Sequence, residues 1–188
     1  GVSDEQWEVH VVGAFHSGYS PDGLSDDEEA LSVWYKEFVH QNYLQVPEDM
    51  PSVKQMAEKI QKSLLTNGGP NSWEEPWFNI EVRNSMCLQT AQLVSNQLRS
   101  ENRYALELDK LPTGEDALEY FLSTSHKGYC VHFASAGTLI LRELGIPARY
   151  VTGFVVKPDA VTYEEGAYKA SVLDSDAHAW GEIYMENY

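Results

Sequence analysis

The spacing of apolar residues predicts that the first hundred residues are mainly helical. Apolar positions three and four residues apart recur in three segments, which predict helices from about residue 26, from Pro51 and over 82–98. The first begins with an acidic capping box at 25–28, and the second stops at the Asn-Gly-Gly-Pro sequence 67–70. The stripes expected to be buried are, helix by helix, Leu31, Trp34, Tyr35 and Phe38; Val53, Met56, Ala57, Ile60 and Leu64; and Cys87, Ala91, Val94 and Leu98.

Later in the chain the pattern changes to a buried helix followed by alternating strands. The helix expected from Cys130 to Leu144 is apolar on nearly every side, which is typical of a helix surrounded by protein. Helices first and antiparallel strands after them define an α+β fold, with the Cys130 helix packed on the sheet. The other elements expected are, in chain order, a strand at 7–15, an extended segment at 104–108, a short helix at 116–122, a strand at 149–156, a polar turn at 157–166 and strand segments at 168–173 and 178–185.

The chain is long enough to form one domain with its own core. Its 188 residues are 43% hydrophobic and contain no internal repeat or low-complexity tract. We divide them into a helical lead-in, 1–103, and a core region, 104–188, and expect the two to form one compact domain. The chain starts without Met and stops at Tyr188 within a strand-like run, so we expect it to be a piece of a longer protein. No apolar run is long enough to cross a bilayer.

The charge balance argues against two classes of partner. Asp and Glu number 29 against 13 Lys and Arg, which gives a formal net charge of −16. Such a surface repels the phosphates of nucleic acids and the headgroups of anionic lipids, so we expect no nucleic-acid binding and no membrane contact by this domain. The acidity either keeps the domain soluble, which is the simpler interpretation, or attracts cationic partners such as lysine-bearing proteins.

Neither a disulfide framework nor a metal site is predicted. The chain has two cysteines, Cys87 and Cys130, which are too few for a framework, and no Cys or His pairs have zinc-ligand spacing. The acidic cluster at 22–29 lacks the alternating spacing of a calcium loop. We expect no cofactor.

Cys130 is the candidate nucleophile. It follows a glycine at the predicted start of a buried helix, where unpaired backbone N–H groups and the helix dipole stabilise a thiolate. The same N–H groups could hold the oxyanion of a tetrahedral intermediate. From this position alone, a reactive and a structural cysteine are about equally supported. Cys87 lies in an apolar stripe and is expected to behave as a small buried hydrophobe.

A nucleophilic cysteine needs a base, and the chain has six histidines. His132 is two positions after Cys130 on one helix and so points to a different side. His126 precedes that helix and could bend back towards Cys130. His178 opens a strand whose alternate positions, Ala179 and Gly181, are small enough to let it pack closely on the buried helix.

Three linked blocks of sequence now carry a family resemblance. They are GYCVHFASA at 128–136, LRELGIPARYVTGF at 141–154 and DAHAWGEIY at 176–184. In this order they closely resemble the transglutaminase-like core domain of bacteria, over roughly 104–185. The preceding residues resemble the helical lead-in of membrane-anchored bacterial members. Gly181 stands where the family usually has a larger aliphatic residue, which is a minor departure.

The resemblance implies a papain-like α+β fold and a Cys-His-Asp triad. Cys130 takes the position of the nucleophile and His178 that of the base. The orienting acid comes from the next strand in the family, so we expect it beyond Tyr188. Glu182 shares the strand face of His178 and is a weaker alternative for this role. The remaining candidates for supporting residues are Trp180 and Tyr129.

The implied reaction is cysteine-dependent acyl transfer on amides through a thioester. The acyl group then passes to an amine or to water, and the sequence leaves both open. The expected substrate is a protein or peptide that carries a glutamine or another amide, with an amine as a possible acceptor. The expected location is an extracytoplasmic domain of a membrane-anchored bacterial protein. The alternative function is a non-catalytic module that binds peptides or proteins on the same fold.

Overall fold

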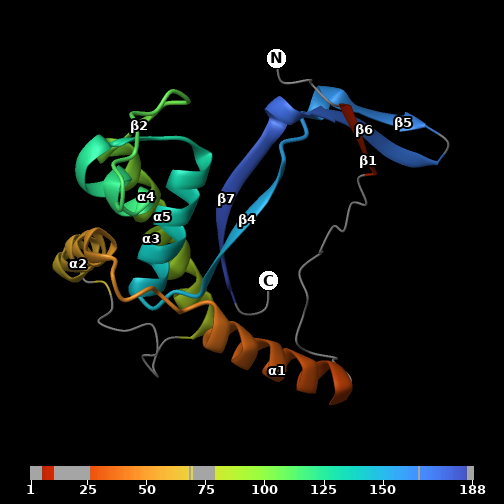
Figure 1. Ribbon diagram of the computed structural model, residues 1–188. Coiled ribbons are helices and arrows are strands. Elements are labelled where there is room, and N and C mark those ends of the chain that lie inside the picture. The colour runs from red at the N-terminus through yellow and green to blue at the C-terminus, as the bar shows by residue number, and fades with distance from the viewer. Residues whose placement is uncertain (1–5, 11–25, 68, 70–78, 165, 186–188) are drawn as a thin grey trace.

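The computed structural model describes residues 6–10, 26–67, 69, 79–164 and 166–185. The first residue of the predicted capping box and the distal part of the strand predicted at 7–15 lie outside these residues. Mixed helices and antiparallel sheets confirm the predicted α+β class (Figure 1).

The helices form near the predicted positions. In chain order they are α1 (Asp26–Asn42), α2 (Pro51–Thr66), α3 (Ile80–Glu101), α4 (Ala117–Tyr120) and α5 (Cys130–Glu143). A π-helical turn, Phe121–Ser125, extends α4, whose first turn is capped by the Asp116 carboxylate accepting from two backbone N–H groups. α5 begins at Cys130, as the sequence predicts.

Within the described residues, the strands form three small sheets. They are β1 (Gln6–His10), β2 (Arg103–Tyr104), β3 (Lys127–Gly128), β4 (Ala148–Phe154), β5 (Val161–Glu164), β6 (Ala167–Leu173) and β7 (Ala177–Ile183). β4 pairs with β7 and β6 pairs with β1 and β5, all antiparallel, whereas β2 pairs with β3 in parallel. The polar turn predicted at 157–166 is wrong in part, because it contains β5. Of the extended segment predicted at 104–108, only Tyr104 belongs to a strand.

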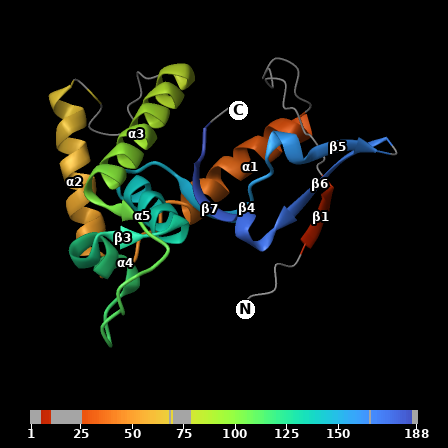
Figure 2. The ribbon, with the colours of Figure 1, turned by 90° about the horizontal axis from the view of Figure 1, so that it is seen from above.

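The core lies between α2, α3 and α5 and continues under the β4–β7 pair (Figure 2). The stripes predicted for α2 and α3 are confirmed as buried or half-buried. The largest fully buried side chains in this cluster are Phe121, Ile140, Ile146, Val53 and Val94. Burial of such side chains removes apolar surface from water and is the main stabilising contribution to the fold.

The prediction that the aromatic stripe of α1 is buried is wrong. Leu31 is 61% exposed and Trp34 is 57% exposed, whereas Val39 in the last turns is buried. Figure 1 shows α1 extending away from the cluster of α2, α3 and α5, so only its C-terminal end approaches the core. Trp34 and Phe38 stack on each other instead, with ring centroids 5.6 Å apart. Helical spacing reports that a helix has an apolar face, but does not report whether another element covers it.

Glycines at both ends of α5 set its position. A Cβ atom on Gly128 would lie 2.7 Å from the Phe121 ring and from the His132 Cβ, so only glycine fits just before the helix. At the other end Gly145 has φ +82°, which ends the helix in a left-handed conformation. Arg142 then donates from Nε to the carbonyl of Ala148 and holds the start of β4 on α5.

We predict that Gly128→Ala destabilises the fold by about 2–3 kcal/mol, because the added methyl group overpacks the turn before α5. Gly137→Ala is the matched control, since its Cβ would meet only a Leu98 methyl group at 3.6 Å. That substitution should stabilise α5 by up to about 1 kcal/mol. Urea unfolding followed by circular dichroism measures both effects. Equal effects of the two substitutions would contradict the packing argument.

Candidate functional site

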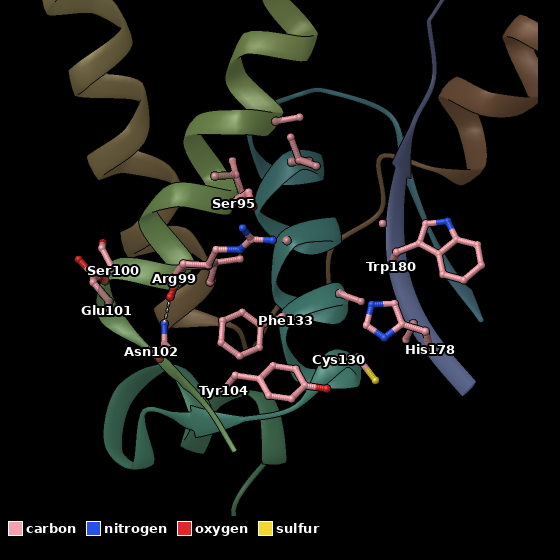
Figure 3. Close-up of a pocket in the computed structure, with 18 of the residues that line it drawn as sticks. Ser95, Arg99, Ser100, Glu101, Asn102, Tyr104, Cys130, Phe133, His178 and Trp180 are labelled. Carbon is pink, nitrogen blue, oxygen red and sulfur yellow. Dashed lines mark hydrogen bonds between the residues drawn. The ribbon is translucent and has the colours of Figure 1, made fainter. Parts of the chain in front are cut away.

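A cavity of about 1090 Å³ lies between α3, α5 and β7. Figure 3 draws 18 of the residues that line it. α5 contributes Cys130, Phe133, Ala134, Gly137 and Leu141; α3 and the following residues contribute Leu88, Ala91, Val94, Ser95 and Leu98–Tyr104; and β7 contributes His178–Gly181 and Ile183. His126 completes the lining.

Cys130 is the first residue of α5, and its half-buried side chain lines this cavity. The first-turn N–H groups of a helix have no acceptors within that helix, so this end of the cavity is a favourable place for negative charge. The predicted position of the cysteine at a helix start is therefore observed.

His178 lies near the start of β7 and lines the same cavity. Figure 3 shows its imidazole and the Cys130 sulfur at the same end of the cavity, between α5 and β7. Among the described residues no hydrogen bond joins the two side chains. The close packing expected from small residues is present, because Ala179 is buried and a Cβ on Gly181 would lie 3.0 Å from Thr138 Oγ1.

Glu182 is held away from His178. Its Oε1 accepts from the Trp180 indole at 2.9 Å, and its Oε2 accepts from Arg149 at 2.8 Å. These hydrogen bonds, the Trp180 bond first, keep the pKa of Glu182 below its usual range. The two oxygens are thus occupied by partners other than His178, so Glu182 does not orient His178 in this structure. No carboxylate in the described part of the chain hydrogen-bonds to the His178 ring.

Tyr129 and His132 form a separate contact at the start of α5. Their rings meet edge to face at 4.7 Å, and His132 Nδ1 accepts from the Tyr129 backbone N–H at 3.4 Å. Burial lowers the pKa of His132. Neither residue is among those that line the cavity. His132 therefore points to a different side of α5 from Cys130, as its spacing predicts. Tyr129 is the residue that directly precedes α5.

His126 lines the cavity, although the sequence left open whether it lies near Cys130. Its Nδ1 lies 3.2 Å from Oδ1 of Asn102, a buried residue whose own Nδ2 donates to the Leu98 carbonyl. Because an amide oxygen can only accept, His126 donates to Asn102 Oδ1 from Nδ1–H. The backbone of His126 is left-handed, with φ +49°. No sequence signal marked Asn102.

Tyr104 is a second lining residue that the sequence did not identify as part of a site. Its ring stacks on Phe133 of α5, with centroids 6.0 Å apart. Figure 3 shows its hydroxyl directed towards the end of the cavity where Cys130 lies. The extended segment predicted there gave no reason to place it beside Cys130, because the contact depends on how β2 packs against α5.

Cys87 is buried on α3, as predicted. Burial raises the pKa of its thiol to about 11, although the nearby Arg83 acts in the opposite direction. A neutral, buried thiol is a poor nucleophile.

Comparison with known proteins identifies the family. The sequence model of the transglutaminase-like superfamily matches residues 78–188, which is more than half of the chain. The chain belongs to the transglutaminase-like superfamily. The match includes the three sequence blocks that carry the resemblance.

Two known proteins from bacteria are similar in sequence to this superfamily member. "Uncharacterized protein YebA" of Bacillus subtilis is 29% identical over 196 residues, which cover 98% of this chain and 23% of YebA. A protein-glutamine gamma-glutamyltransferase of Pseudomonas aeruginosa is 36% identical over 99 residues, which cover 52% of this chain and 14% of that protein. The chain thus spans less than a quarter of the length of either relative.

The fold is similar to a solved transglutaminase-like structure. The periplasmic domain of TgpA from Pseudomonas aeruginosa aligns with a TM-score of 0.54 and 23% sequence identity, covering 80% of this chain and 44% of that domain. This likeness confirms the predicted transglutaminase-like fold. Across the described residues, no helix combines the length and the apolar character that a membrane span requires.

We predict that iodoacetamide alkylates Cys130 at least about 100-fold faster than Cys87 at pH 7. With its pKa at about 11, on the order of one Cys87 thiol in ten thousand is ionised at that pH, and the residue is also shielded from the reagent. Peptide mass mapping after brief labelling measures the two rates. Labelling in 8 M urea is the control, where both cysteines should react. Preferential labelling of Cys87 in the folded protein would contradict the assignment.

Proposed function

We propose that this site carries out cysteine-dependent acyl transfer on amides, with Cys130 as the nucleophile and His178 as the base. The observation that supports this most is that the two side chains line one end of a single cavity, although they come from a helix start and a strand start 48 residues apart in the sequence. Membership of the superfamily supports the same reaction class.

The proposed reaction proceeds through a thioester. His178 takes the proton of the Cys130 thiol, and the sulfur attacks the carbonyl carbon of the substrate amide. The N–H groups of the first turn of α5 stabilise the resulting oxyanion. When the carbon–nitrogen bond breaks, the leaving amine takes the proton from His178. An amine or a water molecule, deprotonated by His178, then attacks the thioester and releases Cys130.

The proposed substrate is a protein or peptide with a glutamine side chain. This proposal is supported by the Pseudomonas aeruginosa relative, which is named as a protein-glutamine gamma-glutamyltransferase. An extracytoplasmic location is supported by the structural similarity to a periplasmic domain. The orienting acid for His178 is proposed to lie on a strand that follows β7, as the family pattern implies.

We expect Cys130→Ala to abolish thioester formation and His178→Gln to lower the turnover of a glutamine peptide by about 10²–10⁴-fold. The first removes the nucleophile and the second removes the base. Cys87→Ala and His40→Gln are matched controls outside the cavity and should retain activity. Mass spectrometry of the acid-quenched protein detects the acyl adduct, and ammonia release measures turnover. An adduct on any residue other than Cys130, or full activity of His178→Gln, would refute the assignment. If no adduct forms but the peptide binds, the non-catalytic binding module becomes the better interpretation.

We also predict that Glu182→Gln changes turnover by less than about threefold, because Glu182 binds Trp180 and Arg149 rather than His178. Loss of a true orienting acid lowers turnover by about 10⁴-fold in a serine-histidine-aspartate enzyme. The same ammonia-release assay separates the two outcomes. A loss of a hundredfold or more would show that Glu182 orients His178 after all.

A further inference from the structure

The cavity wall opposite β7 has a charge unlike that of the chain as a whole. The chain has a net charge of −16, yet Arg99 and Arg103 both line this cavity. Among the lining residues that the structure describes, Glu101 is the single acidic one. The wall made by these residues is therefore positive on an otherwise acidic protein.

Neither arginine has an anionic partner within the described part of the chain. Figure 3 shows the Arg99 side chain reaching from the end of α3 into the cavity. Glu101 does not neutralise the arginines, because its Oε1 is bound by Lys59 and by Gln97, the latter at 2.6 Å. A cation in the last turn of a helix is favourable in itself, which accounts in part for Arg99. Arg103 lies beyond the end of α3, so this interaction with the last helical turn does not account for its position.

His126 lies beside the two arginines in the cavity wall. Asn102 lies between the two arginines in sequence, and its amide oxygen holds the His126 ring through Nδ1 at 3.2 Å. Arg103 and His126 are also held together by their backbones, since the Arg103 N–H donates to the His126 carbonyl at 2.8 Å. This part of the wall is thus held by hydrogen bonds between backbone segments.

We propose that this wall selects substrates that carry a carboxylate near the reactive amide, with Arg99 and Arg103 as the residues that bind it. Guanidinium groups bind carboxylates through paired, charge-assisted hydrogen bonds. An acidic protein repels an anionic substrate at long range, so recognition of one requires local cations of this kind. The position of the reacting amide rests on the proposed function, but the preference for a carboxylate is a property of binding alone.

The test measures binding to protein in which Cys130 is replaced by alanine, so that no turnover is needed. The probes are two fluorescent peptides, each with one reactive glutamine, that differ only by a glutamate or a glutamine two positions away. We expect the glutamate peptide to bind about tenfold more tightly, and Arg99→Gln with Arg103→Gln to remove this preference. Lys62→Gln with Lys110→Gln is the matched control, because it removes two exposed positive charges outside the cavity and should keep the preference. Fluorescence anisotropy gives the affinities.

Salt supplies a second measurement that does not depend on a variant folding. Because the wall is open to solvent, the preference should fall severalfold between 20 mM and 500 mM NaCl. Equal affinity for the two peptides at low salt, or a loss of preference in the lysine control as large as in the arginine variant, would overturn the proposal. Failure of the thioester assay with a preserved preference would count against the proposed function and leave this inference standing.

Discussion

The close contact between α5 and β7 is the constraint on which the site depends. Gly181 lies opposite the turn of α5 that runs from Ala134 to Thr138. Counted from this contact towards the N-terminus, Cys130 lies four to eight residues away along the helix, a rise of about 6–12 Å. His178 lies three residues away along the strand, a length of about 10 Å. The two distances agree, so a helix and a strand that run side by side bring the Cys130 and His178 side chains to the same end of the cavity.

This contact tolerates little change on either side. Any side chain larger than glycine at position 181 would press on Thr138 Oγ1, and Thr138 is itself buried. The hydrogen bond from Arg142 of α5 to the Ala148 carbonyl holds the start of β4 on the helix. Because β4 pairs with β7, this bond also helps to position β7. The relative position of Cys130 and His178 is thus set by backbone packing rather than by a hydrogen bond between the two side chains.

The positions of Cys130 and His178 in the fold were predictable from sequence because the signals for them are local. A helix that is apolar on every side must be buried, and a cysteine at its first residue must lie at a helix N-terminus. The small residues of β7 likewise indicated that this strand packs against α5.

The prediction of a buried α1 stripe was wrong because the spacing of Trp34 and Tyr35 indicates an apolar face but not whether another element covers it. Glu182 was placed on the correct strand, but its partner Arg149 lies on β4, and a cross-strand pair of this kind is fixed only by the register of the sheet. His126 and Asn102 are 24 residues apart, and nothing in either sequence position indicated their contact.

In the proposed function, chemistry and substrate recognition occupy different parts of one cavity. Cys130 and His178 occupy the end between α5 and β7, whereas the arginines and His126 belong to the wall formed by the end of α3, β2 and the turn before β3. His178 is exposed, so water would reach the proposed thioester on Cys130 freely. In the proposed mechanism an amine competes with that water only if it is held near the thioester, because positioning raises its effective concentration by orders of magnitude. The partition between transamidation and hydrolysis is then decided by what the cavity binds beside the acyl group.

A positive wall disfavours a protonated amine in its immediate vicinity and favours a carboxylate there. An amine acceptor would accordingly have to approach from the β7 side, where His178 can take its proton, and not across the arginines.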